Sequence, residues 1–141
     1  MAQRFLVVGL GRFGTAIALG LSERGCEVIA VDSELDKVDA VKDRIGHAIE
    51  LDSTDPAALQ SLDVRSCSTA IVAMGEGFEA AVLTVAALKD CGVARVIARA
   101  RNPRQARVLK AVGADEIIEV ESEVGRKLAE SLAGNERRTQ A

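Results

Sequence analysis

One segment restricts the fold more than any other: the sequence GLGRFG at residues 9–14, which directly follows the apolar run Phe5–Val8. A GxGxxG pattern between a strand and a helix predicts a turn that holds phosphate groups. Gly9 allows the tight turn, Gly11 lets the backbone approach a pyrophosphate, and Gly14 lets the helix pack against the strand. The amides and the dipole of the helix N-terminus then face the phosphates. The alternative is a turn that is merely rich in glycine.

The rest of the chain alternates short β-rich runs with helical patterns. We expect strands at residues 5–8, 28–31, 48–51, 70–73, 96–98 and 116–120, each followed by a helix. Ser33, Asp55 and Asn102 are expected to cap three of these helices. The second helix should run from Leu35 through Ile45. This order predicts an α/β fold, a doubly wound, six-stranded parallel sheet with strand order 3-2-1-4-5-6.

The length of 141 residues is that of one domain. We assign residues 1–133 to a nucleotide-binding domain, and residues 134–141 to a polar tail or to the start of a linker to a further C-terminal domain. The last helix carries an apolar stripe of Val124, Leu128 and Leu132. An ordinary sheet edge is already covered at this point of the fold. We therefore expect the helix to cross to a second copy of the chain and form a homodimer.

Composition excludes several classes of partner. The 18 Lys and Arg residues stand against 21 Asp and Glu, a net charge of −3, which opposes non-specific binding to nucleic acids or anionic membranes. No apolar stretch approaches the about twenty residues that cross a membrane, so we expect no membrane insertion. The N-terminus lacks a signal-peptide pattern. The three widely spaced cysteines indicate reduced thiols in a cytosolic protein.

Polar residues follow the second and third strands, at the edge of the sheet where ligands of such folds bind. Asp32 ends the second strand and suits the ribose hydroxyls, while repelling a 2′-phosphate. Alternatively, Asp32 caps the following helix, but Ser33 can fill that role. Asp52, Ser53 and Thr54 follow the third strand and suit the edge of an adenine, unless Asp52 serves only to cap a helix.

The fourth and fifth strands end at the same edge. Ala73, Met74 and Gly75 follow the fourth strand, and Gly75 and Gly77 allow a ligand to approach the backbone. Met74 suits core packing as well as ligand contact. Arg99 ends the fifth strand and is expected to face the crevice.

Arg12 lies among the glycines of the phosphate turn. A dinucleotide needs only the helix N-terminus there, whereas a triphosphate leaves further negative charge for a guanidinium to neutralise. The alternative is a solvated arginine in the first helical turn.

The sequence shows no catalytic machinery. It has no nucleophile elbow, no GKS or GKT phosphate loop, no His/Cys metal cluster and no second lobe for a hydride acceptor. His47 has no acidic or nucleophilic partner at a telling spacing, and we treat it as structural. We therefore expect a binding protein and not an enzyme. The rival interpretation is a fragment of a small NAD-dependent oxidoreductase.

Five motifs occur in order: GLGRFG, Val31-Asp32, Asp52-Ser53-Thr54, Val72-Ala73-Met74-Gly75 and Gly113-Ala114-Asp115. With them, residues 4–133 resemble the N-terminal KTN or RCK domain of the regulatory subunits of Ktr/Trk-type potassium uptake systems. The resemblance implies a Rossmann-type sensor that forms dimers, typically four to an octameric ring, on the cytoplasmic side of a membrane-embedded potassium-translocating subunit. ATP and ADP, or NAD(H) in the Trk branch, would shift the ring between conformations.

The resemblance also implies roles for single residues. Gly9, Gly11 and Gly14 would hold the phosphates, Asp32 the ribose, and Asp52 to Thr54 the adenine. Arg12 would reach the terminal phosphates of ATP. We also expect Phe13 and Ser33 among the cofactor-binding residues. Glu121 would help to hold a divalent cation, Mg²⁺ or Ca²⁺, near the phosphates at the dimer interface.

Overall fold

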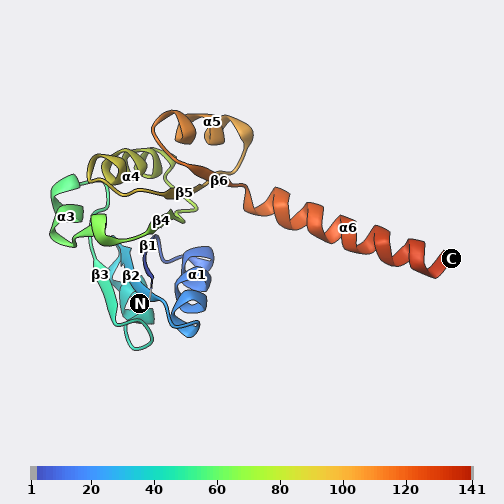
Figure 1. The fold of residues 1–141 in the computed structure, drawn as a ribbon, viewed down its shortest axis with the longest axis horizontal. Coiled ribbons are helices and arrows are strands. Elements are labelled where there is room, and N and C mark those ends of the chain that lie inside the picture. The colour runs from blue at the N-terminus through green and yellow to red at the C-terminus, as the bar shows by residue number, and fades with distance from the viewer. Residues whose placement is uncertain (1–2, 141) are drawn as a thin grey trace.

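The computed structural model describes residues 3–140, with side chains described through residue 135. Its core is one parallel sheet with the strand order β3-β2-β1-β4-β5-β6, which confirms the predicted fold (Figure 1). The strands are β1 (Arg4–Val8), β2 (Glu27–Asp32), β3 (His47–Glu50), β4 (Thr69–Val72), β5 (Val96–Arg99) and β6 (Glu116–Ile118). The helices are α1 (Arg12–Glu23), α2 (Leu35–Val41), α3 (Pro56–Ser61), α4 (Phe78–Asp90), α5 (Pro103–Ala111) and α6 (Val120–Gln140), with a 3₁₀ turn at Val64–Ser66.

The two faces of the sheet are covered by different helices. Successive strand residues point to opposite faces, so Leu6 and Val8 pack in the core beneath α3, α4 and α5, whereas Val7 packs in the core beneath α1 and α2. Both faces are therefore dry, as the continuous apolar runs of β1, β2 and β4 predict.

Two of the three expected helix caps are confirmed. Asp55 accepts a hydrogen bond from the Ala57 amide at the start of α3, and Asn102 accepts one from the Gln105 amide at the start of α5. The third is wrong, because α2 begins after Glu34 and not after Ser33. That helix also ends at Val41, and Ile45 is buried from the turn beyond it.

The C-terminal part differs most from the expectation. β6 ends at Ile118, and the Glu123 amide already donates to the Glu119 carbonyl in a first helical turn. α6 then runs through Gly134 to Gln140, so the expected end of the helix before residue 134 is wrong. A single glycine costs only about 1 kcal/mol in a helix interior, which does not stop a helix flanked by good helix formers. The domain boundary at residue 133 stays a prediction.

Figure 1 shows α6 leaving the body of the domain as a straight arm. Its apolar stripe is uncovered: Val124, Leu128 and Leu132 are 61%, 58% and 58% exposed. In residues 3–140, none of the helices is both long enough and apolar enough to cross a membrane.

Candidate functional site

A cavity of about 570 Å³ lies at the carboxyl ends of the strands. Most of the residues singled out from the sequence line it: Gly9, Gly11, Arg12, Asp32, Ser33, Asp52, Ser53, Thr54, Ala73, Met74, Gly75, Gly77 and Arg99. The structure adds lining residues that sequence reasoning missed, namely Val8, Glu34, Lys37, Glu76 and Ala80. Glu34 and Lys37 form an ion pair of 2.8 Å. The spacing of three residues between Glu34 and Lys37, at the start of a helix, is the one sequence signal that could have pointed to this pair.

The glycine turn has the geometry that a phosphate site requires. Gly9 has φ +99°, and its amide donates to the Val31 carbonyl at 2.9 Å. A Cβ on Gly14 would lie 1.7 Å from the Gly9 carbonyl oxygen, so helix and turn approach too closely for any side chain. Gly11 is the N-cap of α1, with no side-chain cap bond and no acidic residue in the first helical turn. The first amides of α1 therefore remain available to an anion.

Asp32 joins two loops of the site. Its Oδ2 accepts a hydrogen bond from the Leu10 amide at 2.8 Å, and its Oδ1 accepts one from the Glu34 amide at 2.9 Å. Asp32 thus holds the turn before α2, the role that had been assigned to Ser33. A carboxylate has about four acceptor positions, so both oxygens keep capacity for ribose hydroxyls.

The loop after β3 is ordered by its own side chains. Asp52 Oδ1 accepts from the Thr54 hydroxyl at 2.6 Å and from the Thr54 amide at 3.0 Å. These two donors lower the pKa of Asp52, hydroxyl first. The alternative role of Asp52 as a helix cap is wrong, because Asp55 caps α3. Ser53 is buried, and its hydroxyl faces Thr84 of α4 at 2.8 Å.

Two arginines reach the cavity in different ways. Arg12 is exposed at the start of α1. Arg99 has a side chain only 18% exposed; its guanidinium carbon lies 5.3 Å from the centre of the Phe13 ring, and its Nη2 lies 3.4 Å from Glu121 Oε1. The Arg99 Nε is buried without a hydrogen-bond partner. Phe13 does not line the cavity, but it holds a residue that does.

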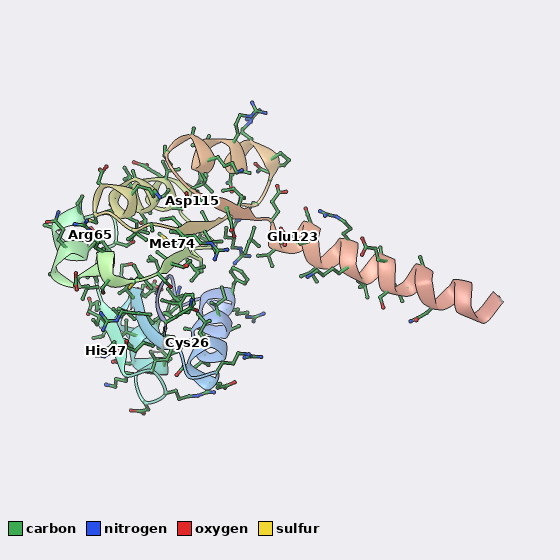
Figure 2. The ribbon with its side chains drawn as sticks, viewed as in Figure 1. Cys26, His47, Arg65, Met74, Asp115 and Glu123 are labelled. Carbon is green, nitrogen blue, oxygen red and sulfur yellow. The ribbon has the colours of Figure 1, made fainter. Side chains whose placement is uncertain are left out.

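A second cavity of about 220 Å³ adjoins the first. The two share Arg99 and the segment Met74–Gly77, and Arg101 and Gln105 extend the second one toward α5. Arg101 Nη2 donates to the Gly75 carbonyl. Figure 2 shows Met74 near the middle of the globular part of the molecule, from which α6 extends; Met74 follows β4, which ends at Val72.

Glu121 lies in the first turn of α6 and is exposed. No group of three or more His, Cys, Asp and Glu side chains that could hold a metal ion occurs in the described part of the chain. A cation at Glu121 would thus take its other ligands from elsewhere. His47 is exposed at the start of β3, away from Met74, which lies at the carboxyl ends of the strands (Figure 2).

Comparison with known proteins places this site in context. The family model described as the TrkA-N domain matches residues 5–120. The chain is 39% identical over 135 residues to the Ktr system potassium uptake protein C of Bacillus subtilis (strain 168), covering 96% of this chain and 61% of that protein. It is 38% identical to protein A of the Ktr system of the same organism, covering 93% of this chain and 59% of that protein. The chain thus spans about three-fifths of the length of both relatives.

Solved structures show the same fold. The TrkA-N domain of the inner membrane protein ybaL from Escherichia coli superposes with a TM-score of 0.81 at 21% identity, covering 94% of this chain and 98% of that one. The GsuK channel bound to NAD gives a TM-score of 0.79 at 18% identity, covering 91% of this chain and 23% of that one. GsuK bound to ADP gives 0.78 at 18% identity, covering 91% and 34%.

Proposed function

The chain belongs to the TrkA-N domain family, and we propose that it binds an adenosine nucleotide and thereby regulates a potassium channel or transporter in the membrane. The observation that carries this proposal is the cavity in which a glycine turn with unused helix amides faces Asp32. A dinucleotide-binding fold places phosphates at such a turn and a ribose at such an acid.

ATP and ADP are the proposed ligands. Two guanidinium groups, those of Arg12 and Arg99, border one cavity, and a triphosphate supplies the negative charge that both can neutralise. Asp32 and Glu34 both border the cavity, and their negative charges would repel a 2′-phosphate, which disfavours NADP.

NAD(H) is the second candidate. The adjoining cavity of about 220 Å³ gives room for the other half of a dinucleotide beyond the phosphates. GsuK, a structural neighbour, has been solved both with NAD and with ADP.

A divalent cation, Mg²⁺ or Ca²⁺, would bind together with ATP through Glu121 and phosphate oxygens. Hard oxygen ligands suit such ions. Glu121 is exposed and contacts Arg99 only at 3.4 Å, so its carboxylate remains accessible to a cation.

The proposed assembly is a homodimer made by α6, with dimers joining into an octameric ring on the cytoplasmic side of a membrane-embedded potassium-translocating subunit. The uncovered stripe of α6 supports the dimer. The similarity to Ktr system potassium uptake proteins supports the membrane partner.

Regulation needs no catalysis. If ATP stabilises one ring conformation relative to the other by about 1–3 kcal/mol per site more than ADP does, the sum over several sites shifts the ring decisively. An NAD-dependent oxidoreductase would in addition need a catalytic acid or base in the cavity, and we assign none.

The deciding experiment identifies the nucleotide that co-purifies with the protein, by mass spectrometry after denaturation. We expect ATP or ADP. Recovery of NAD(H) would favour the second candidate, and turnover of NAD with a panel of hydroxy acids would favour the enzyme. A calorimetric titration that detects no binding of adenosine nucleotides or of NADH would refute the proposed function.

A further inference from the structure

One hydrogen bond joins two walls of the cavity, the loop after β3 and helix α4. Among the described residues, three polar side chains are buried, those of Ser53, Thr69 and Thr84. Ser53 and Thr84 are 6% and 0% exposed, and their hydroxyl oxygens lie 2.8 Å apart. A sequence separation of 31 residues makes this a tertiary contact between the loop after β3 and the middle of α4.

The neighbours of both residues face the ligand space. Asp52 and Thr54, on either side of Ser53, line the cavity. Ala80 lines it too, and it lies four residues before Thr84, one turn earlier on the same face of α4. The bond between the two hydroxyls therefore sets the spacing between the loop wall and the helix wall.

This spacing belongs to the base end of the site. Along the sheet, the glycine turn follows β1, Asp32 ends β2, and the loop with Ser53 follows β3. A nucleotide with its phosphates at the turn and its ribose at Asp32 thus places its base against the loop. This step rests on the proposed function.

We propose that Thr84, through Ser53, is a positioning residue for the base of the bound nucleotide. Thr84 does not itself line the cavity. Removing either hydroxyl releases the loop after β3 from α4 and leaves the remaining hydroxyl buried without this hydrogen bond. Loss of one such bond changes an equilibrium by about three- to ten-fold.

The test uses Ser53→Ala, Thr84→Val and Thr84→Ser in the whole chain, with AMP, ADP and ATP as titrants in a calorimeter. Ser53→Ala is the milder change, because the Thr84 hydroxyl can turn back to a carbonyl of its own helix. Thr69→Val is the matched control, since Thr69 is a buried threonine at the amino end of β4, whereas the cavity lies at the carboxyl ends of the strands.

We expect each of the two variants, Ser53→Ala and Thr84→Val, to weaken the binding of AMP, ADP and ATP by one common factor, because the three nucleotides share the base. That factor should be smaller for Ser53→Ala than for Thr84→Val. Thr84→Ser keeps the hydroxyl group and should retain the wild-type affinities. Thr69→Val should also leave the affinities unchanged. A purely structural role would lower the melting temperature and leave the affinities as in the wild type; that result would overturn the proposal, as would a larger loss for ATP than for AMP. If the wild type bound no nucleotide, the proposed function would be wrong as well, which separates the two failures.

Discussion

At the scale of single residues, Arg12 and Arg99 supply positive charge to one cavity but are held differently. Arg99 rests on the Phe13 ring with only 18% of its side chain exposed, whereas Arg12 is exposed. Arg99 is fixed before a ligand arrives. Arg12 must give up side-chain freedom to contact a phosphate, and under the proposed function it contacts only the terminal phosphates, which AMP lacks.

Replacing Arg12 by alanine should therefore discriminate between nucleotides. A hydrogen bond to a charged group contributes roughly 1.5–3 kcal/mol, which is a factor of about ten to more than a hundred in affinity. Arg12→Ala should weaken ATP by that factor, ADP by less and AMP hardly at all, as measured by isothermal titration calorimetry. Arg104→Ala, an exposed arginine on α5 outside the cavity, is the control.

Two results would contradict this role of Arg12. Tighter binding of NADH than of ATP by the wild type would favour the NAD(H) interpretation. An equal loss for AMP and ATP in Arg12→Ala would show that Arg12 does not contact the terminal phosphates.

Gly14 and Gly20 offer a matched pair of glycines within α1. A Cβ on Gly14 would meet the Gly9 carbonyl at 1.7 Å, whereas a Cβ on Gly20 would meet only the end of the Arg24 side chain at 3.5 Å. Gly14→Ala should abolish nucleotide binding and lower the melting temperature, because the turn itself must move. Gly20→Ala should raise stability by about 0.5–1 kcal/mol through helix propensity. A change in melting temperature of the same sign for both variants, relative to the wild type, would contradict the close approach at Gly14.

Sequence reasoning found the residues of the cavity better than their contacts. Asp32, Asp52 and Ser53 all line the cavity as predicted. That Asp32 accepts from the Leu10 amide, and that Ser53 turns its hydroxyl to Thr84, depends on loops distant in sequence. No local pattern encodes such pairings.

At the scale of elements, Asp115 joins the end of α4 to the start of β5 (Figure 2). Its Oδ2 accepts from the Val96 amide at 2.7 Å and from Lys89 Nζ at 3.0 Å. The amide first, and then the lysine, lower the pKa of Asp115 from its usual value. Lys89 also donates to the Val93 and Ala94 carbonyls, so the same lysine fixes the α4–β5 turn.

Asp115→Asn should make part of the stability independent of pH. Because the pKa is lowered in the folded state, the carboxylate stabilises the fold above its unfolded pKa, and this contribution is lost as the pH falls through the folded pKa. The side chain is 40% exposed, so we expect less than about 1 kcal/mol at neutral pH. Urea unfolding should show the largest difference in stability between wild type and variant at about pH 7, and the difference should narrow as the pH is lowered toward about 3. A constant difference across that range would contradict a role for the charge.

Element boundaries were harder to predict than the elements themselves. The strands followed from apolar runs that only a sheet covered on both faces can bury. The ends of α2 and α6 did not follow, because α2 ends at Val41 although Ile45 keeps the apolar spacing, and α6 continues through Gly134. The apolar spacing predicts that α2 continues and Gly134 predicts that α6 ends, whereas in both helices the local backbone decides the boundary.

At the scale of the whole molecule, the exposed stripe of α6 predicts self-association. Leu128→Glu places a negative charge at the centre of the stripe. Arg126→Glu places a glutamate two residues away, on the opposite side of the helix, and changes the net charge by two units where Leu128→Glu changes it by one, so it is the stricter control for charge. We expect the wild type and Arg126→Glu to sediment as dimers at tens of micromolar, and Leu128→Glu as a monomer.

A monomeric wild type at that concentration would contradict the dimer. Identical sedimentation of Leu128→Glu and the wild type as dimers would place the interface elsewhere. Nucleotide titration of the Leu128→Glu monomer then shows whether the site is complete in one chain.

The arm formed by α6 is also a lever. Its 21 residues span about 30 Å, so a tilt of about 10° at Val120 would displace its far end by about 5 Å. Glu121, at the root of the arm, faces Arg99 in the wall of the cavity. A shift of a few tenths of an ångström between Arg99 and Glu121 that tilts α6 would therefore grow with distance along the helix. The far end of α6 is where the smallest rearrangement of the site would be easiest to detect.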